Sequence, residues 1–439
     1  MATGSKDPLP PHLSPGREIH VVISIRSGHH KAQEHYDTEV KPLLDSYDIE
    51  YRTHTTTSAK SIITLTKSLF LVNATKGVKQ TIILLSGDGG VVDLVDTLTG
   101  ILNREHNDVR LPSIFLKPVI VLIPMGTANA LAWSSKVAQD PLKVMMTGTP
   151  KSLPSFQVRF SPGAKLVTEE GQGREALADN EEDESVMYGA VVFSWGLHAS
   201  LVAMSDTTEY RQHGIKRFGM AAEQLMKDEH VYKGKIKWRT GASEHVKLPT
   251  NEHSYILAVL VSNLEEHFQI SPTTKPVDGA LRLVYIGSEP GSEIMRILGL
   301  AYQSGKHVDD PKVTYESIES LRIEFEEDDE QFRLVCVDGK IVAVAKGGWA
   351  EVTRLPGTGM EARRVVDLAS EYYFLCTLSI QETRNWRNTC HRVGLRDLEH
   401  IGRRYFFRPC LLSQTHVILL QRAASQQIDE EDNDSLTST

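Results

Sequence analysis

The stretch TIILLSGDGGVVDLVDTLTGIL, residues 81–102, decides the fold of this chain. It opens with an uncharged apolar run that is typical of a strand buried inside a parallel sheet. A glycine-rich turn, residues 86–90, follows directly, and apolar side chains then recur at helical spacing at Val91, Leu94, Val95, Leu98, Ile101 and Leu102. A strand that passes through such a turn into a helix predicts an α/β domain whose turn faces a ligand.

The same alternation extends on both sides of this stretch. Strands are predicted at 18–25, 49–55 and 118–123, and helices at 31–46 and 58–72. Alternating strands and helices build a parallel sheet with right-handed crossovers, and ligands of such sheets bind beyond the carboxyl ends of the strands. We therefore predict an α/β domain with a parallel sheet over residues 18–150.

Short β-rich segments replace this pattern after residue 150. They predict a second domain over residues 151–358, a mainly antiparallel β-sandwich. Residues 1–17 are polar and proline-rich, so we expect a disordered N-terminal tail there. The C-terminal extension, residues 359–439, carries no pattern that predicts its structure.

Composition excludes several classes of protein. The chain has 439 residues and a net charge of −9, which argues against a nucleic-acid binder that neutralises many phosphates. Its four cysteines show no C-x-x-C spacing and no zinc pattern. The longest apolar runs, such as 119–123, are far shorter than the ~18 residues of a membrane span, and the N-terminal residues lack the features of a secretory signal. We expect a cytoplasmic protein without a transmembrane segment, and the sequence does not indicate its oligomeric state.

Two glycine-bearing loops carry the predicted chemistry. Glycines in the turn 86–90 let the backbone approach a phosphate, and the helix start behind them favours negative charge. Asp88 in this turn suits a general base or an orienter of an attacking hydroxyl, or else it merely caps the helix. The second loop, 126–132, also follows a buried strand and opens a helix. Neither loop is a Walker A or a G-x-G-x-x-G sequence, so P-loop and Rossmann sites are excluded.

Six short motifs in a fixed order resemble the diacylglycerol kinase catalytic-domain family, and above all its sphingosine- and ceramide-kinase branch. They are the segments 86–96, 123–132, 193–199, 209–218, 305–307 and 337–339. The resemblance covers roughly residues 19–355. It implies a nucleotide-binding α/β domain of the NAD-kinase and diacylglycerol-kinase type, a β-sandwich that takes the lipid, and the cofactors ATP and Mg²⁺. It also implies transfer of the γ-phosphoryl group to a lipid hydroxyl, with peripheral association at a membrane surface.

The resemblance assigns roles to residues at matching positions. Asp88 is implied as the catalytic base, and Arg211 and Arg217 as the cations that stabilise the transferred phosphoryl group. The implied nucleotide contacts are Ser27, Gly28, Thr55, Thr56, Thr57, Gly87, Asp88, Gly89, Gly126, Thr127, Asn129, Asp338 and Gly339. No protein ligand for a metal is assigned, since Mg²⁺ would arrive on the nucleotide phosphates.

Departures from the family pattern affect both the implied nucleotide site and the implied lipid site. Ile25-Arg26 stands where Asn-Pro is usual, and Asp93 stands where a glutamate is expected. Lys340 replaces the glutamate of Asp-Gly-Glu, which predicts either a direct phosphate contact or weaker handling of the metal. Ser200 replaces the aspartate that would pair with the ammonium group of a sphingoid base, unless Asp206 substitutes for it. A neutral acceptor such as diacylglycerol is then favoured, and the lipid class stays open.

Three functions compete. The leading interpretation is an ATP-dependent lipid kinase that acts on diacylglycerol or a sphingoid base. A silent nucleotide- or lipid-binding module derived from the family would explain Lys340 and Ile25-Arg26, but a silent module has no chemical need for Asp88 and the two arginines. NAD kinases share the Gly-Asp-Gly loop, whereas residues 195–199 and 210–218 resemble the lipid branch.

Overall fold

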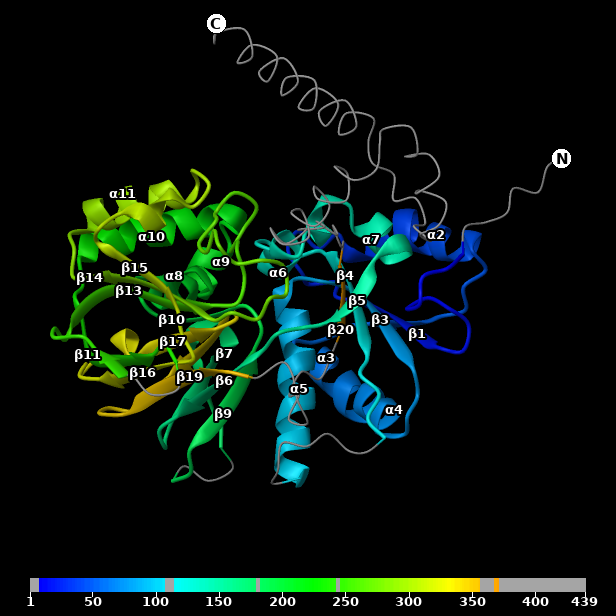
Figure 1. Ribbon diagram of the computed structural model, residues 1–439, viewed down its shortest axis with the longest axis horizontal. Coiled ribbons are helices and arrows are strands. Elements are labelled where there is room, and N and C mark those ends of the chain that lie inside the picture. The colour runs from blue at the N-terminus through cyan, green and yellow to red at the C-terminus, as the bar shows by residue number, and fades with distance from the viewer. Residues whose placement is uncertain (1–7, 107–113, 179–181, 242–244, 356–366, 371–439) are drawn as a thin grey trace, which may run out of the picture. The chain divides into compact units, whose positions relative to one another are not determined.

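The computed structural model describes residues 8–106, 114–178, 182–241, 245–355 and 367–370, all within one compact unit. Its first sheet has the strand order β2-β1-β3-β4-β20-β5 (Figure 1). The strands are β1 (Glu18–Ile23), β2 (Arg52–Thr55), β3 (Gln80–Ser86), β4 (Val119–Pro124), β5 (Thr149–Ser152) and β20 (Asp367–Ser370). The first four run parallel, as the sequence predicts, because each is followed by a helix that returns the chain.

Helices connect these strands. The first crossover is α1 (Ala32–His35), a π-helical turn (Tyr36–Val40) and α2 (Lys41–Ser46), and the second is α3 (Ser61–Leu65), a second π turn (Thr66–Phe70) and α4 (Leu71–Thr75). Three more helices follow, namely α5 (Asp88–His106), α6 (Ala130–Ser134) and α7 (Pro141–Thr147). The start of α7 shows how the local sequence determines where a helix begins. Asp140 accepts a hydrogen bond of 3.0 Å from the Lys143 N–H, and Pro141 occupies the first helical position.

The second sheet is antiparallel throughout its described pairings and curls on itself. Its strand order is β8-β7-β18-β17-β10-β13-β11-β16-β19-β6-β9, with β12, β14 and β15 paired beside this path. The strands are β6 (Phe156–Phe160), β7 (Lys165–Thr168), β8 (Gly173–Ala176), β9 (Ser185–Gly189), β10 (Val192–Gly196), β11 (Tyr232–Arg239), β12 (His245–Lys247), β13 (Glu252–Val259), β14 (Arg282–Gly287), β15 (Val313–Ser317), β16 (Ser320–Phe325), β17 (Leu334–Val337), β18 (Lys340–Ala343) and β19 (Trp349–Arg354). The predicted mainly antiparallel β-sandwich domain is confirmed in this form.

Alternating side chains give the second sheet one apolar face. Along β11 buried and more exposed residues alternate, so that Tyr232, Ile236 and Trp238 face a common apolar core. Trp195 is fully buried in that core, and its ring Nε1–H donates 2.8 Å to the Phe332 carbonyl. Four helices accompany this sheet: α8 (Leu197–Ser205), α9 (Thr208–Arg211), α10 (Arg217–Asp228) and α11 (Gly291–Ala301). α8 packs on β10, β13 and β17, and α10 packs on α8.

The N-terminal prediction is wrong for residues 8–17. His12 and Leu13 are buried, and the His12 ring Nε2 lies 2.7 Å from the Met145 carbonyl. The Thr81 hydroxyl also donates to the His12 carbonyl. These contacts fix the segment on β3 and α7, although its polar composition suggested a tail. Residues 1–7 lie outside the described residues.

The C-terminal extension contributes one strand to the first sheet. β20 lies between β4 and β5, parallel to the former and antiparallel to the latter (Figure 1). Leu368 and Ala369 are fully buried there. The rest of the extension, 359–366 and 371–439, lies outside the described residues. Within the described ranges, none of the helices has the length and apolar character to cross a bilayer.

Candidate active site

The carboxyl ends of the four parallel strands meet at one edge of the first sheet. Ile23 of β1 pairs in register with Thr55 of β2 and with Leu85 of β3, and Ser86 pairs with Pro124 of β4. The loops that follow these strands therefore start side by side. The nucleotide contacts predicted in the α/β domain lie in these loops or at their borders, with Thr55 at the end of β2 and Asp88 at the start of α5, as the rule for parallel sheets leads us to expect.

The two glycine loops pack backbone against backbone. A Cβ placed on Gly87 would approach the Gly126 Cα to 2.8 Å, and one on Gly126 would approach the Gly87 Cα to 2.6 Å. Gly28 has φ +50°, and a Cβ there would collide with the Met125 carbonyl oxygen. Side chains at these three positions would force the loops apart. By contrast, a Cβ on Gly89 would meet nothing within 4 Å, so the open side of the turn lies there.

Asp88 joins the first loop to the second. Its carboxylate accepts 2.7 Å from the Ala130 N–H and 2.9 Å from the Leu131 N–H at the start of α6. Burial raises the pKa of the Asp88 carboxyl, and the two N–H donors oppose that rise. Asp88 therefore caps a helix, but the capped helix belongs to the neighbouring loop and not to its own.

Asn129 closes the second loop. It adopts the left-handed conformation with φ 55°, which asparagine tolerates better than most residues. Its side-chain Oδ1 accepts 2.8 Å from the Gly126 N–H, and its Nδ2 donates 2.9 Å to the Gly126 carbonyl. Thr127 is exposed and does not cap α6. An N-cap by Thr127 therefore does not explain this loop.

Hydroxyl groups border the same edge from β1 and β2. Ser27 Oγ donates 2.9 Å to Ser24 Oγ and lies 3.3 Å from Ser86 Oγ. Ser27, a predicted nucleotide contact, therefore lies against the end of β3. Thr56 is buried, with its N–H bonded to the Ile23 carbonyl. Thr55 and Thr57 are exposed on either side. The structure thus brings together the predicted nucleotide contacts of these four loops.

The two predicted arginines meet around Asp206 instead. Arg211 contacts the Asp206 Oδ1 through its Nε at 3.0 Å and its Nη2 at 2.8 Å, and Arg217 approaches the same oxygen to 3.9 Å. Glu170 lies 3.6 Å from the other Nη of Arg211. Burial lowers the pKa of Arg217, although Asp206 opposes the shift. The predicted ammonium ligand Asp206 therefore already holds a cation.

Ser200 faces the interior of the second domain. It is buried on α8, and its Oγ accepts 2.7 Å from the Tyr232 hydroxyl of β11. Burial raises the pKa of Tyr232 to about 12, so this hydroxyl keeps its proton at neutral pH. Tyr232 had no signal in the sequence, because its partner lies on another element.

Asp338 is bonded to the backbone of its own domain. Its carboxylate accepts backbone N–H groups from Ala190 at 2.6 Å, Val191 at 3.0 Å and Val192 at 2.5 Å. Burial raises the pKa of the Asp338 carboxyl to about 7, the three donors oppose the rise, and the charge of Asp88 adds to it. Gly339, with φ +86°, completes the turn between β17 and β18. Asp338 therefore holds the connection from β9 to β10 and approaches Asp88 from the second domain.

Lys340 pairs with two carboxylates of α5. Its Nζ lies 2.9 Å from Asp93 Oδ1 and 3.4 Å from Asp96 Oδ2. The other oxygen of Asp96 accepts 2.9 Å from the Tyr188 N–H. The sequence analysis did not predict a role for Asp96. Its spacing of three residues from Asp93, which places both on one helix face, was the available signal.

A protein-only metal site does not fit the described residues. They contain no group of three or more histidine, cysteine, aspartate or glutamate side chains that could hold a metal ion. The carboxylates nearest the glycine loops already have partners, namely backbone N–H groups for Asp88 and Asp338 and an ammonium for Asp93. A magnesium ion would therefore depend on oxygens supplied by a nucleotide.

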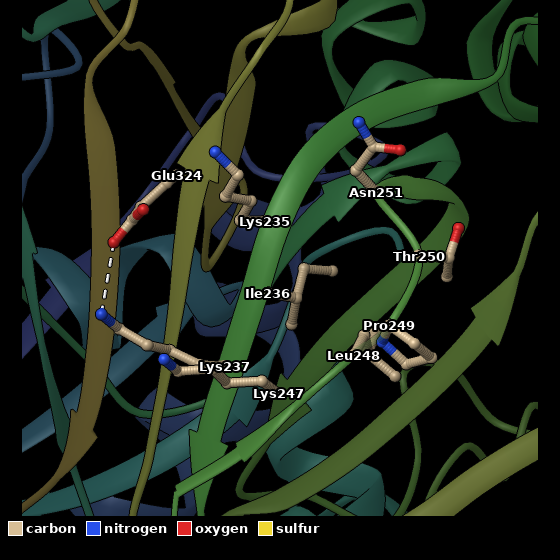
Figure 2. Close-up of a pocket in the computed structure, with 9 residues that line it drawn as sticks. All are labelled: Lys235, Ile236, Lys237, Lys247, Leu248, Pro249, Thr250, Asn251 and Glu324. Carbon is tan, nitrogen blue, oxygen red and sulfur yellow. Dashed lines mark hydrogen bonds and ion pairs between the residues drawn. The ribbon is translucent and has the colours of Figure 1, made fainter.

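A cavity of about 380 Å³ lies away from this edge, on β11 and the segment after β12 (Figure 2). It is lined by Lys235, Ile236, Lys237, Lys247, Leu248, Pro249, Thr250, Asn251 and Glu324. None of these is a predicted site residue. Lys237 is paired with Glu324 at 3.2 Å and Lys235 with Glu326 at 2.9 Å, so most of the local positive charge is neutralised.

Comparison with known proteins agrees with this arrangement. Residues 18–155 match the diacylglycerol kinase catalytic domain. Sphingosine kinase 1 of Rattus norvegicus is 22% identical over 325 residues, which are 66% of this chain and 77% of the relative. A crystal structure of a diacylglycerol kinase from Bacillus anthracis str. Sterne shares the fold, with a TM-score of 0.52 and 15% identity over 82% of this chain and 98% of that one. Residues 18–155 therefore form a diacylglycerol kinase catalytic domain.

Proposed function

We propose that this protein transfers the γ-phosphoryl group of ATP to a lipid hydroxyl. The observation that carries the proposal is the contact between Gly87 and Gly126, which fuses two glycine loops at the ligand-binding edge of a kinase-family domain. N–H groups in the first turn of a helix have no acceptor within it, and they suit the phosphate oxygens of a nucleotide. At the start of α5 the Gly90 N–H donates 3.1 Å to the Gly87 carbonyl, so the preceding Gly89 N–H is the one we propose for a phosphate.

Asp88 is the proposed base. The acceptor oxygen forms a bond to the γ-phosphorus, the bond from that phosphorus to the bridging oxygen of ADP breaks, and the acceptor proton passes to the Asp88 carboxylate. Each Asp88 oxygen accepts one N–H and keeps a lone pair for this proton. The raised pKa of Asp88 makes it a stronger base than an exposed aspartate.

The proposed charge stabilisers must exchange partners. Arg211 and Arg217 are held by Asp206, and a phosphoryl group that binds them has to compete with that carboxylate. Guanidinium groups suit this exchange because they stay charged and bind oxygens in a planar fork. Magnesium bound with the nucleotide would neutralise further phosphate charge.

The substrate we propose is a neutral lipid alcohol such as diacylglycerol. Ser200 is bonded to Tyr232, and Asp206 to Arg211, so neither offers a free carboxylate to the ammonium group of a sphingoid base. The similarity to sphingosine kinase 1 makes sphingosine the alternative that has to be tested. Either substrate requires the protein to bind at a membrane surface.

Phosphate transfer from labelled ATP to a panel of lipids tests the proposal. The panel contains diacylglycerol, sphingosine, dihydrosphingosine and ceramide, with NAD as a further acceptor. We expect labelled diacylglycerol, and we expect Asp88→Asn to reduce the rate by roughly 10²–10⁴-fold. Asp37→Asn, an exposed position on the first crossover, serves as the matched control.

Other outcomes redirect the assignment. A labelled sphingoid product would keep the kinase but reject the neutral acceptor, and labelled NAD would reject the lipid. An Asp88→Asn variant as active as the wild type would reject the base. ATP binding without any transfer would favour the silent module, in which Asp88 only braces the two loops.

A further inference from the structure

Lys340 is the counter-ion of two carboxylates on the helix that begins at Asp88. Its ammonium lies between Asp93 and Asp96, at 2.9 Å and 3.4 Å. We infer that Lys340 is a positioning residue that takes the place of a divalent cation between these carboxylates and holds the second domain against α5. Its effect on turnover rests on the proposed kinase function, whereas its role as a counter-ion does not.

Burial gives this pairing more weight than an ordinary surface ion pair. The side chains are 21% exposed for Lys340, 16% for Asp93 and 25% for Asp96. Burial lowers the pKa of Lys340, but the two carboxylates outweigh it and the net shift is upward, so the ammonium stays charged. Without it, two like charges would face each other one helical turn apart in a poorly hydrated place.

The pairing closes a ring of contacts between the domains. From α5, Asp96 accepts the Tyr188 N–H at the end of β9. The next residue, Gly189, has no room for a side chain, because its Cβ would lie 2.7 Å from the Asp338 Oδ2. Asp338 accepts the Ala190 N–H and precedes Lys340 by two residues, and Lys340 returns to α5 through Asp93.

The ring lies close to the proposed chemistry. Asp93 follows Asp88 by five residues on the same helix, less than two turns away. Because a helix moves as a unit, a shift of α5 at Asp93 also displaces the Asp88 carboxylate from the loop that it braces. Misplacement by about 1 Å can reduce turnover by ~10²-fold. Lys340 would thus act on the reaction through position, without contact with the substrate.

Charge substitution at Lys340 tests the counter-ion directly. Lys340→Glu would create a cluster of three carboxylates, and Lys340→Met would leave two carboxylates without a cation. The control is Lys346→Glu, because Lys346 pairs with Asp328 at 2.7 Å where both side chains are largely exposed. The full-length proteins are unfolded thermally without nucleotide, at constant ionic strength, with and without millimolar MgCl₂ or CaCl₂.

We expect divalent cations to leave the Tm of the wild type unchanged and to raise that of Lys340→Glu by several degrees. Lys340→Met should unfold at a lower temperature than the wild type, and Lys340→Arg should restore most of the loss. Equal cation responses of Lys340→Glu and Lys346→Glu would overturn the inference, as would wild-type stability of Lys340→Met. If Lys340→Glu does not fold, the Tm values of Lys340→Met and Lys340→Arg decide whether Lys340 acts as a counter-ion.

Steady-state kinetics test the positioning role. At a temperature well below unfolding, Lys340→Met should lower kcat by roughly 10–100-fold, while the KM for ATP changes much less. Mg²⁺ beyond the amount that saturates the nucleotide should restore part of kcat in Lys340→Glu but not in Lys346→Glu. An unchanged kcat in Lys340→Met would reject the positioning role. A wild type inactive on all acceptors would reject the kinase, and the thermal measurements would still decide the counter-ion.

Discussion

The Tyr232 hydroxyl donates a hydrogen bond of 2.7 Å to Ser200 Oγ. This bond ties α8 to β11. We propose that Ser200, which carries no carboxylate, lies where the ammonium group of a sphingoid base would bind. We predict that Ser200→Asp, which Tyr232 can still hold in place, raises the ratio of kcat/KM for sphingosine to that for diacylglycerol. A charge-assisted hydrogen bond of about 1.5–3 kcal/mol corresponds to roughly 10–150-fold. Tyr232→Phe is the control, since it frees Ser200 without adding charge, and an unchanged ratio in Ser200→Asp would place the lipid head elsewhere.

Gly126→Ala should destabilise the fold, because its Cβ would come within 2.6 Å of the Gly87 Cα and 2.7 Å of the Asn129 Oδ1. We expect a loss of about 1–3 kcal/mol in the free energy of unfolding, as is usual for overpacking. Gly89→Ala is the matched comparison, because nothing lies within 4 Å of its Cβ. Urea unfolding of both variants measures the difference. Equal stabilities would show that the loops can separate without cost.

Arg217→Gln should reduce kcat by about 10²–10³-fold if this guanidinium stabilises charge in the transition state. Arg174→Gln provides a control, because Arg174 pairs with Glu330 at 2.8 Å outside the proposed site. Rates at saturating ATP and lipid measure the effect. A loss of similar size in both variants would point to folding and not to catalysis.

Acid should weaken the fold through His20. This side chain is fully buried, and burial, with the nearby His54 adding to the effect, lowers its pKa from 6.5 to about 4. The His20 imidazole therefore binds a proton below pH 6.5 in the unfolded chain, but in the folded chain it does so only near pH 4. The resulting stability is complete above pH 6.5 and is lost as the pH falls toward 4.

The variant His20→Leu isolates this contribution. We expect the decrease in unfolding free energy between pH 7 and pH 4.5 to be smaller by about 2–3 kcal/mol than in the wild type, at 1.36 kcal/mol per pKa unit. His267→Leu, at a side chain that is 76% exposed, should retain the wild-type dependence. Identical pH profiles for His20→Leu and the wild type would refute the assignment.

Truncation separates β20 from the residues beyond it. A chain that ends at residue 372 keeps every contact of the first sheet among the described residues, whereas one that ends at residue 355 loses the buried Leu368 and Ala369. We expect the shorter chain to lose several degrees in Tm and much of its soluble yield, because β4 and β5 would present unpaired edges. Similar yields and Tm values for both chains would show that β20 contributes little.

Local signals predicted the α/β sheet well. The uncharged run before Ser86 and the helical spacing after it depend on residues close in sequence, and both β3 and α5 formed there. The fused loops at the strand ends also followed from the rule for parallel sheets. Partners across the fold could not be predicted, because the sequence gives no distance between Asp88 and Ala130 or between Lys340 and Asp93.

The same limit explains the predictions that failed or stayed open. Residues 8–17 look like a tail by composition, yet His12 and Leu13 are buried. His12 bonds to Met145, 133 residues away, and to Thr81, 69 residues away, so its neighbours are distant in sequence. β20 spans only Asp367–Ser370 and is too short for its alternation to stand out. The roles of Asp88, Arg211 and Arg217 rest on similarity and on geometry, and they stay predictions until the substitutions are measured.

The position of β20 also has a consequence for biosynthesis. Ser152 of β5 bonds to Asp367 of β20 at 3.0 Å, and 215 residues separate them. A ribosome that adds about 5–20 residues per second needs roughly 10–40 s to supply the missing strand. During that interval the nascent first domain exposes the backbone of β4 and β5 to other chains, so the order of synthesis makes this sheet dependent on its last strand for protection against aggregation.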